Sequence, residues 1–164
     1  SLHDALPISN CSARLDNLRA AIIRAQLPLL EENIHRWNVR YGILESGFRS
    51  APGLEVVERK QHEEFVGSSF QFKASGIGAD NIPDFLKRCL ARGVEIKWFG
   101  GEEPVAFTSR YDSWAYLGKM DPLPQTIRIL STTCDMRVPL TFSEQDCQDI
   151  AGIVADEAAM YLRT

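Results

Sequence analysis

The sequence predicts an α+β fold, a small layer with strands on one side and two or three helices on the other. The first observation is a helical repeat of apolar residues that begins at Leu15 and resumes after a break at Leu30. The second is a set of short apolar or alternating segments bounded by glycine and proline, which is typical of strands. The third is a capped helical segment that begins at Ser143.

A long, kinked helix is expected first. Apolar residues recur every three or four positions from Leu15 to Ile22 and again from Leu30 to Leu44, and this spacing places the second set on one helical face. Pro28 lies between the two stretches, where its missing amide donor should kink the helix or split it. Ser46-Gly47, followed by Pro52-Gly53, is predicted to end the helical region.

The remaining elements follow from local signals. Phe70 and Phe72 alternate with polar residues, as in a half-buried strand. Pro139 cannot donate to a ladder, so its strand is predicted to lie at a sheet edge. Ser143, with Asp146 three residues later, is predicted to cap the last helix. The expected elements are strands at 54–57, 69–74, 94–99 and 136–140, and helices from Asp80 or Asn81 to 91, at 124–130 and from 143 to about 161.

The chain is expected to have three parts. Its 164 residues are enough for one domain, or for one domain with a connecting helix. Residues 1–9 are predicted to be a non-native or disordered leader, because residues 1–8 match the translation of a common sequencing adapter. Residues 10–47 are assigned to the connecting long helix, and residues 48–164 to a small C-terminal α+β domain.

The composition argues against several classes of function. With 45% apolar and 24% charged residues, the chain has the composition of an ordinary globular protein. A net charge of -4 argues against nucleic-acid binding, and the longest apolar runs are too short to cross a membrane. The four cysteines are scattered, and no histidine or cysteine cluster has the spacing of a metal site. The cysteines are therefore expected to be free thiols in a reducing, cytoplasmic compartment.

Arg14 is the first candidate site residue. It lies at a helix start among small polar residues, where its planar guanidinium could hold a phosphate or a carboxylate. Asn10 and Ser12 could add hydrogen bonds, and the free amides of a helix start favour anions. Considered alone, Arg14 is better explained as an exposed arginine at a helix terminus.

A second candidate region is rich in aromatic residues. Trp98-Phe99 ends a predicted strand, and the long segment after it contains Arg110, Tyr111 and Trp114. Aromatic faces stack on rings and an arginine can fork onto an anion, so this region suits a sugar or nucleotide ligand. The alternative, which the sequence leaves open, is that these aromatic residues pack under the loop as a satellite core.

One segment carries a family resemblance. The asparagine/serine-x-Arg-Met/Leu-x-x-Leu-x-Ala-Ala pattern of the DegT/StrS-type sugar aminotransferases, which are pyridoxal phosphate enzymes of fold type I, is similar to Ser12-Ala13-Arg14-Leu15-Asp16-Asn17-Leu18-Arg19-Ala20-Ala21. Further similarities follow in the family's order at Arg92-Gly93-Val94, Leu123-Pro124 and 138–146, so the resemblance covers nearly all of residues 10–164. The family often has a histidine-tyrosine pair where this chain has Trp98-Phe99, a departure that bears on the substrate more than on the reaction.

The resemblance implies a role for the chain and for its candidate residues. The chain would be the small C-terminal domain of an α/β parent enzyme that moves an amino group from an amino acid, commonly glutamate, to a keto-sugar, usually carried on a nucleotide. In the family, a homodimer shares its active site across the interface. Carried over, Ser12 and Arg14 would reach the partner's active site and contact the cofactor phosphate or the substrate, while the segment from Trp98 to Trp114 would border the substrate site.

The resemblance also implies that part of the catalytic machinery lies upstream. None of the chain's lysines falls in the family's lysine motif, so the catalytic lysine is expected before residue 10 and the chain alone is expected to be inactive. Two alternatives stay open. The parent could be a sugar dehydratase or a lysine-less member of the family, or the chain could be a stand-alone binding or dimerisation module. The lysines concerned are Lys60, Lys73, Lys87, Lys97 and Lys119.

Overall fold

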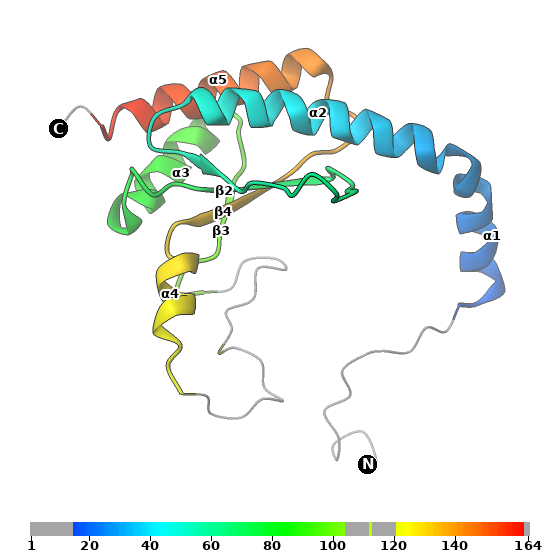
Figure 1. The fold of residues 1–164 in the computed structure, drawn as a ribbon, viewed down its shortest axis with the longest axis horizontal. Helices are drawn as coiled ribbons and strands as arrows, with labels where there is room; N and C mark the ends of the chain where they lie inside the picture. The colour runs from blue at the N-terminus through cyan, green and yellow to red at the C-terminus, as the bar shows by residue number, and fades with distance from the viewer. Residues whose placement is uncertain (1–14, 104–111, 113–120, 163–164) are drawn as a thin grey trace.

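Helices cover one face of a small antiparallel sheet (Figure 1). The computed structural model describes residues 15–103, 112 and 121–162. In that part of the chain, α2 and α5 lie side by side across the sheet, and α3 packs against α5. This arrangement confirms the predicted α+β layer. The elements are α1 (Asn17–Gln26), η2 (Leu27–Leu29), α2 (Leu30–Ser50), β1 (Glu55–Val56), β2 (Ser69–Lys73), η3 (Ala79–Asn81), α3 (Ile82–Ala91), β3 (Lys97–Trp98), α4 (Pro124–Leu130), β4 (Thr133–Arg137) and α5 (Glu144–Ala159).

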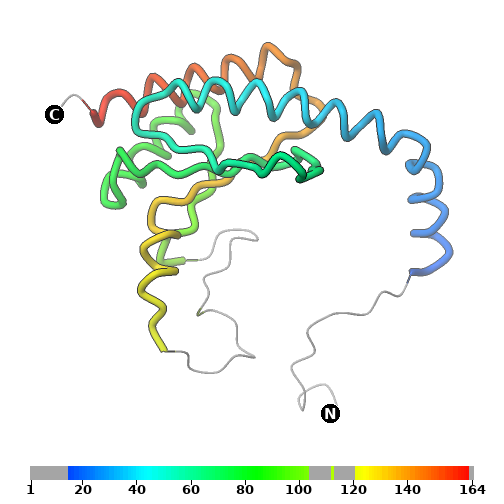
Figure 2. Tube along the Cα trace, viewed as in Figure 1, coloured from blue at the N-terminus to red at the C-terminus, as the bar shows by residue number. Residues whose placement is uncertain are grey.

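The long N-terminal helix is split at Pro28, as predicted. A single 3₁₀ turn, η2, contains the proline and separates α1 from α2. Because proline has no N–H to donate, the α-helical ladder cannot run through this position. The axis of α1 therefore turns away from that of α2, which is visible in the tube representation (Figure 2). No residue of α1 is buried against the rest of the described structure.

The prediction that Ser46-Gly47 ends this helical region was wrong, because α2 continues to Ser50. Gly47 faces α5, and a Cβ atom built on it would lie 2.5 Å from the Cβ of Ala151. The glycine thus permits close approach of two helices, and the chain turns only at Pro52-Gly53, where Gly53 has a φ of 82°. A positive φ of this kind is readily adopted by glycine.

The sheet has the strand order β1-β2-β4-β3, with each neighbouring pair antiparallel. The predicted edge strand at 136–140 was wrong. The observed strand β4 begins earlier, at Thr133, and lies between β2 and β3. Pro139 falls beyond its end and removes no ladder hydrogen bond, so it carries no information about the edge of the sheet.

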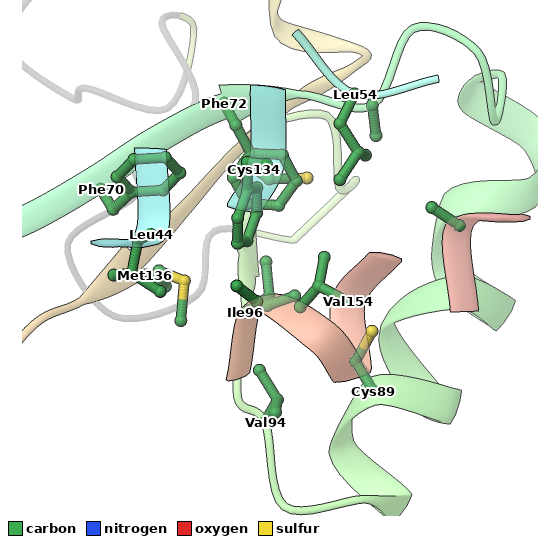
Figure 3. Packing of buried hydrophobic residues seen from close by; sticks show 14 of the residues in the cluster. Leu44, Leu54, Phe70, Phe72, Cys89, Val94, Ile96, Cys134, Met136 and Val154 are labelled. Carbon is green, nitrogen blue, oxygen red and sulfur yellow. The ribbon is translucent and has the colours of Figure 1, made fainter. Parts of the chain in front are cut away.

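The core lies between the sheet and the helices (Figure 3). Phe70 and Phe72 point from β2 towards α2, and the ring of Phe48 packs edge-on against both at centroid distances of 4.8 Å. Cys134 and Met136 extend the same apolar surface along β4. Burial of these side chains is the main favourable contribution to folding. Because alternate residues of a strand point to opposite faces, the same burial directs Gln71 and Asp135 to the other side of the sheet.

Helix α5 is fixed at both ends. Its predicted cap is confirmed, since Ser143 Oγ accepts from the Asp146 N–H at 3.1 Å and Asp146 Oδ2 accepts from the Ser143 N–H at 2.7 Å. Near its other end, Glu157 accepts from Arg88 Nε at 2.7 Å and from Arg92 Nη1 at 3.0 Å. These two ion pairs tie α3 to α5 and so hold the helical layer in place over the sheet.

Candidate functional site

The face of the sheet opposite the helices, which we call the polar face, is the strongest candidate for a binding site in the described part of the chain. Its side chains come from alternate positions of β2 and β4 and from the edge strand β3. The residues that form it are Ser69, Gln71, Lys97, Phe99, Asp135 and Arg137.

Strand register brings these residues together. Asp135 of β4 lies directly opposite Gln71 of β2 on one side and Lys97 of β3 on the other. Ser69 lies opposite Arg137 in the next row on the same face. Directly opposed residues in an antiparallel pair have Cβ atoms about 5 Å apart, so the functional groups of each row can contact one ligand.

A hollow of about 280 Å³ opens on the polar face. Its lining combines two cations, one carboxylate, one amide, two hydroxyls and one aromatic ring. These groups can bind an anion and can hydrogen-bond to a polyhydroxylated ligand. The residues around it are Ser68, Ser69, Gln71, Lys97, Phe99, Asp135 and Arg137.

Asp135 is the buried acid of the polar face, with 9% of its surface exposed. Burial raises its pKa, and the charges of Lys97 and Arg137 and a hydrogen bond from Gln71 offset only part of that rise. Neither cation makes an ion pair within 4.0 Å of Asp135 among the described residues. The positive charges of Lys97 and Arg137 therefore remain available to a ligand.

Phe99, a predicted substrate-binding residue, lines this hollow. It follows β3 directly, and its N–H donates to the carbonyl of Thr133 at 3.1 Å. Trp98 lies one residue earlier and on the opposite face, because it pairs with the fully buried Cys134. Its Nε1 donates to the carbonyl of Ser131 at 2.9 Å, and its half-buried indole packs against the core. The contribution of either residue to substrate binding stays a prediction.

The other predicted site residues lie outside the described residues. They are the expected cofactor-binding residues Asn10, Ser12 and Arg14 and the expected substrate-binding residues Arg110, Tyr111 and Trp114. Their roles stay predictions.

The sequence patterns did not point to Asp135 or Arg137, and Lys97, although part of the segment Lys97-Trp98-Phe99, was given no role in binding. Asp135 fell outside the predicted strand, since that strand was placed at 136–140. The signal that could have found these residues is the alternation of buried and polar positions along 133–137, read together with that along 69–73.

No residue of the polar face is assigned to pyridoxal phosphate. Lys97 is the lysine that lines the hollow, and it lies directly opposite Asp135 on the neighbouring strand. Lys97 lies outside the family's lysine motif, so the resemblance gives it no bond to the cofactor.

Other kinds of centre find no support in the described part of the chain. Its histidine, cysteine, aspartate and glutamate side chains form no group that could hold a metal ion. Burial raises the pKa of the Cys89 and Cys134 thiols to about 12, so neither is a ready nucleophile at neutral pH. No helix within the described ranges is both long enough and apolar enough to span a membrane.

Comparison with known proteins identifies a matching family. The sequence model of the DegT/DnrJ/EryC1/StrS aminotransferase family matches residues 5–155. Among curated proteins, none matches the sequence significantly.

Solved aminotransferase structures have the same fold over most of the chain. The aminotransferase TlmJ from Streptoalloteichus hindustanus superposes with a TM-score of 0.70 at 18% identity, over 87% of this chain and 36% of its own. The sugar aminotransferase CalS13 from Micromonospora echinospora gives a TM-score of 0.69 at 17% identity, over 87% of this chain and 35% of its own. S. venezuelae DesV, solved in complex with a ketimine intermediate, gives 0.71 at 20% identity, over 88% and 37%.

These superpositions cover most of this chain but only part of each solved structure. The chain spans little more than a third of each, between 35% and 37% of their length. At such identities the similarity establishes the fold, and it confirms the predicted likeness of this fold to part of a fold-type I aminotransferase.

Proposed function

The chain belongs to the DegT/DnrJ/EryC1/StrS aminotransferase family, and we propose that it forms the small domain of an enzyme that transfers an amino group from glutamate to a nucleotide-linked keto-sugar. The observation that carries this proposal is the family match over residues 5–155, nearly the whole chain. The likeness to CalS13, which is named as a sugar aminotransferase, supports a sugar as the acceptor.

The proposal divides the work between this chain and the rest of the enzyme. Pyridoxal phosphate would supply the electron sink for transamination. The catalytic lysine would lie upstream, and Asn10, Ser12 and Arg14 would hold the cofactor phosphate or the substrate. Trp98, Phe99, Arg110, Tyr111 and Trp114 would form part of the sugar site. The chain by itself would then bind and orient ligands without catalysing transfer.

A homodimer in the cytoplasm is part of the same proposal, with each active site completed by the partner subunit. Two features support it. Helix α1 exposes large apolar side chains, with Leu18 72% and Ile22 52% exposed, and such a surface favours association. The described cysteines are all free and buried, in keeping with a reducing compartment.

The test is transamination by the longer protein encoded by the reading frame that contains this chain. With pyridoxal phosphate, glutamate and a panel of nucleotide-linked keto-sugars, we expect an amino-sugar product by mass spectrometry. The 164-residue chain is the matched control and should give none. Dehydration of the sugar in place of amination, or transfer by the 164-residue chain alone, would contradict the proposal.

Site variants of the longer protein test the assigned cofactor contact. Arg14→Gln should weaken the binding of pyridoxal phosphate by about tenfold, the usual effect of losing one charge-assisted contact. Arg24→Gln is the control, because Arg24 is an exposed arginine in the last turn of α1. Equal cofactor affinity of the two variants would remove Arg14 from the site.

A further inference from the structure

We propose that a hollow at the edge of the sheet, where the chain before β3 diverges from the chain after β4, binds a free α-amino acid with an apolar side chain. This edge hollow has a volume of about 400 Å³, which is within the usual range for small-molecule sites. The inference goes beyond the proposed function and does not rest on it. The charged residues that line the edge hollow are Glu95, Lys97 and Arg137.

Strand register explains why the edge hollow exists. Lys97 lies opposite Asp135, and the same register continued by two residues would place Glu95 opposite Arg137. The pairing of β3 with β4 begins only at Lys97, so Glu95 and Arg137 line a gap between the two chains instead of a ladder. A carboxylate and a guanidinium therefore lie on the two sides of one opening.

The backbone of β4 adds a donor to this opening. The Val138 N–H donates to the Ser68 carbonyl at 3.0 Å, on the side of β4 that faces β2. Backbone groups of successive strand residues point to opposite sides, so the N–H and carbonyl of Arg137 are directed towards the gap. The Arg137 N–H is thus placed to bind a carboxylate beside its own guanidinium.

Both walls of the edge hollow are held by the rest of the fold. On the side after β4, Arg40 Nε donates to the Phe142 carbonyl at 2.6 Å. On the side before β3, the Val94 N–H donates to the Cys89 carbonyl at 2.9 Å. A ligand would therefore meet a site that is already formed, and little binding energy would be lost in ordering it.

The charges around the edge hollow are separated from one another. Counting only the residues that the structure describes, Glu95, Lys97 and Arg137 form no ion pair within 4.0 Å. Together with Asp135, which lies opposite Lys97, they make two cations and two carboxylates, a cluster without net charge when all four are ionised. An α-amino acid also carries both charges and no net charge at neutral pH. Its ammonium would bind Glu95, and its carboxylate would bind Arg137 and Lys97.

Apolar side chains form most of the remaining lining. Val94 and Met136 are almost completely buried. An aliphatic side chain of the ligand would bury apolar surface here, whereas a charged side chain would lose its hydration. Leucine should therefore bind more tightly than glycine or glutamate. The apolar residues are Val94, Met136, Pro139, Phe142 and Ile150.

The experiment is a titration of the 164-residue chain with L-leucine, followed by backbone amide NMR. We expect the largest shifts at Val94, Glu95 and Arg137. Glycine and L-glutamate should bind at least about tenfold more weakly, since neither covers the apolar lining with an uncharged side chain. Leucinamide, which lacks the carboxylate, and isocaproate, which lacks the ammonium group, should each also bind about tenfold more weakly.

Two substitutions assign the two charges of the ligand. Glu95→Gln should weaken the binding of L-leucine by about tenfold and leave that of isocaproate unchanged, because isocaproate has no ammonium group. Arg137→Gln should weaken the binding of both ligands by about tenfold, because both have a carboxylate. Glu95 and Arg137 are exposed, so both variants are expected to fold, and thermal unfolding verifies this.

Matched controls remove the same charges elsewhere on the sheet. Glu55 belongs to β1 and Lys73 to β2, and neither lines the edge hollow. Glu55→Gln and Lys73→Gln should each change the affinity for L-leucine by less than about twofold.

Three results would overturn the inference. They are the absence of shifts around the edge hollow at millimolar L-leucine, equal affinity of Glu95→Gln and the unsubstituted chain for L-leucine, or equal affinity for L-leucine and glycine. The proposed function is tested separately, by amino-sugar formation in the longer protein.

Discussion

The two faces of one sheet are made by alternate residues of the same strands, yet they differ in almost every physical property. Phe70 and Phe72 are completely buried beneath α2, while their neighbour Gln71 faces a hollow. The covered face is apolar and tightly packed. The polar face carries the charged side chains of Lys97, Asp135 and Arg137, which lie close enough together to contact one ligand. Stability and recognition are therefore separable in this sheet, residue by residue, and substitutions at adjacent positions should affect one without the other.

The largest expected effect is on the covered face. Phe72→Ala should lower the free energy of unfolding by about 3–5 kcal/mol, because it leaves a cavity beneath Phe48. Gln71→Ala, one residue away on the polar face, should change it by less than about 0.5 kcal/mol. Urea denaturation measures both. Similar losses for the two variants would mean that the polar face also supports the fold.

A smaller effect is expected at the buried acid of the helical layer. Glu157→Gln should destabilise the chain by about 1–2 kcal/mol, since Arg88 and Arg92 would lose their charged partner. Asp156→Asn is the control, because that carboxylate, although paired with Arg92, is 70% exposed, and its replacement should cost much less.

The pH dependence of Glu157 has a definite sign. Burial alone would raise its pKa, but hydrogen bonds from Arg92 and Arg88 outweigh burial and hold the pKa below its usual value. Its contribution is therefore fully present above the pKa of the unfolded chain, about 4.3, and is lost as the pH falls through the folded-state value. Unfolding curves of Glu157→Gln and the unsubstituted chain should converge in acid. A constant difference at every pH would assign the effect to packing.

The acid of the polar face should behave in the opposite way. Because burial raises the pKa of Asp135, its ionisation disfavours the folded state once the pH exceeds the pKa of the unfolded chain, about 3.9. Asp135→Asn should therefore stabilise the chain at pH 7, by about 0.5 kcal/mol, and give no gain in strong acid. Thermal unfolding at both pH values measures this, with the exposed Asp121→Asn as control. Destabilisation at neutral pH would show that the carboxylate is already fully compensated.

The smallest expected effect concerns two buried thiols of the core, Cys89 on α3 and Cys134 on β4. With pKa values of about 12, Cys89 and Cys134 should resist alkylation in the folded chain at pH 8 and react only after denaturation. Mass spectrometry of the labelled peptides measures each site separately. Rapid labelling of Cys134 in the folded chain would mean that the covered face opens to solvent.

Local signals predicted most elements but not their pairing. The cap at Ser143 and the helix at 124–130 depend on neighbouring residues, and both are confirmed. The bounds of β4 depend on β2 and β3, which lie far away in the sequence. The local signal from Pro139 therefore led to the wrong prediction of an edge strand at 136–140. Gly47 is a similar case, because its role is set by Ala151 on another helix.

The candidate site was harder to predict for the same reason. Phe99 was recognised from its aromatic neighbourhood, but Lys97 in the same segment was given no role, and Asp135 and Arg137 were not recognised. Lys97 and Asp135 become neighbours only through the register of β3 with β4, and a shift of one residue would direct them to opposite faces. The register between β3 and β4 cannot be derived from composition or residue spacing, because it depends on where both strands lie in the sheet.

Because the helix is split at Pro28, a small rotation at the split moves the far end of α1 by a larger distance. The helix has ten residues and is therefore about 15 Å long, and a single 3₁₀ turn joins it to α2. A rotation of about 10° at that turn displaces the far end of α1 by roughly 2.6 Å, given a rise of 1.5 Å per residue. Pro28→Ala would restore the missing N–H donor at this turn, so α1 and α2 could join into one continuous helix. The start of α1 would then lie away from its present position.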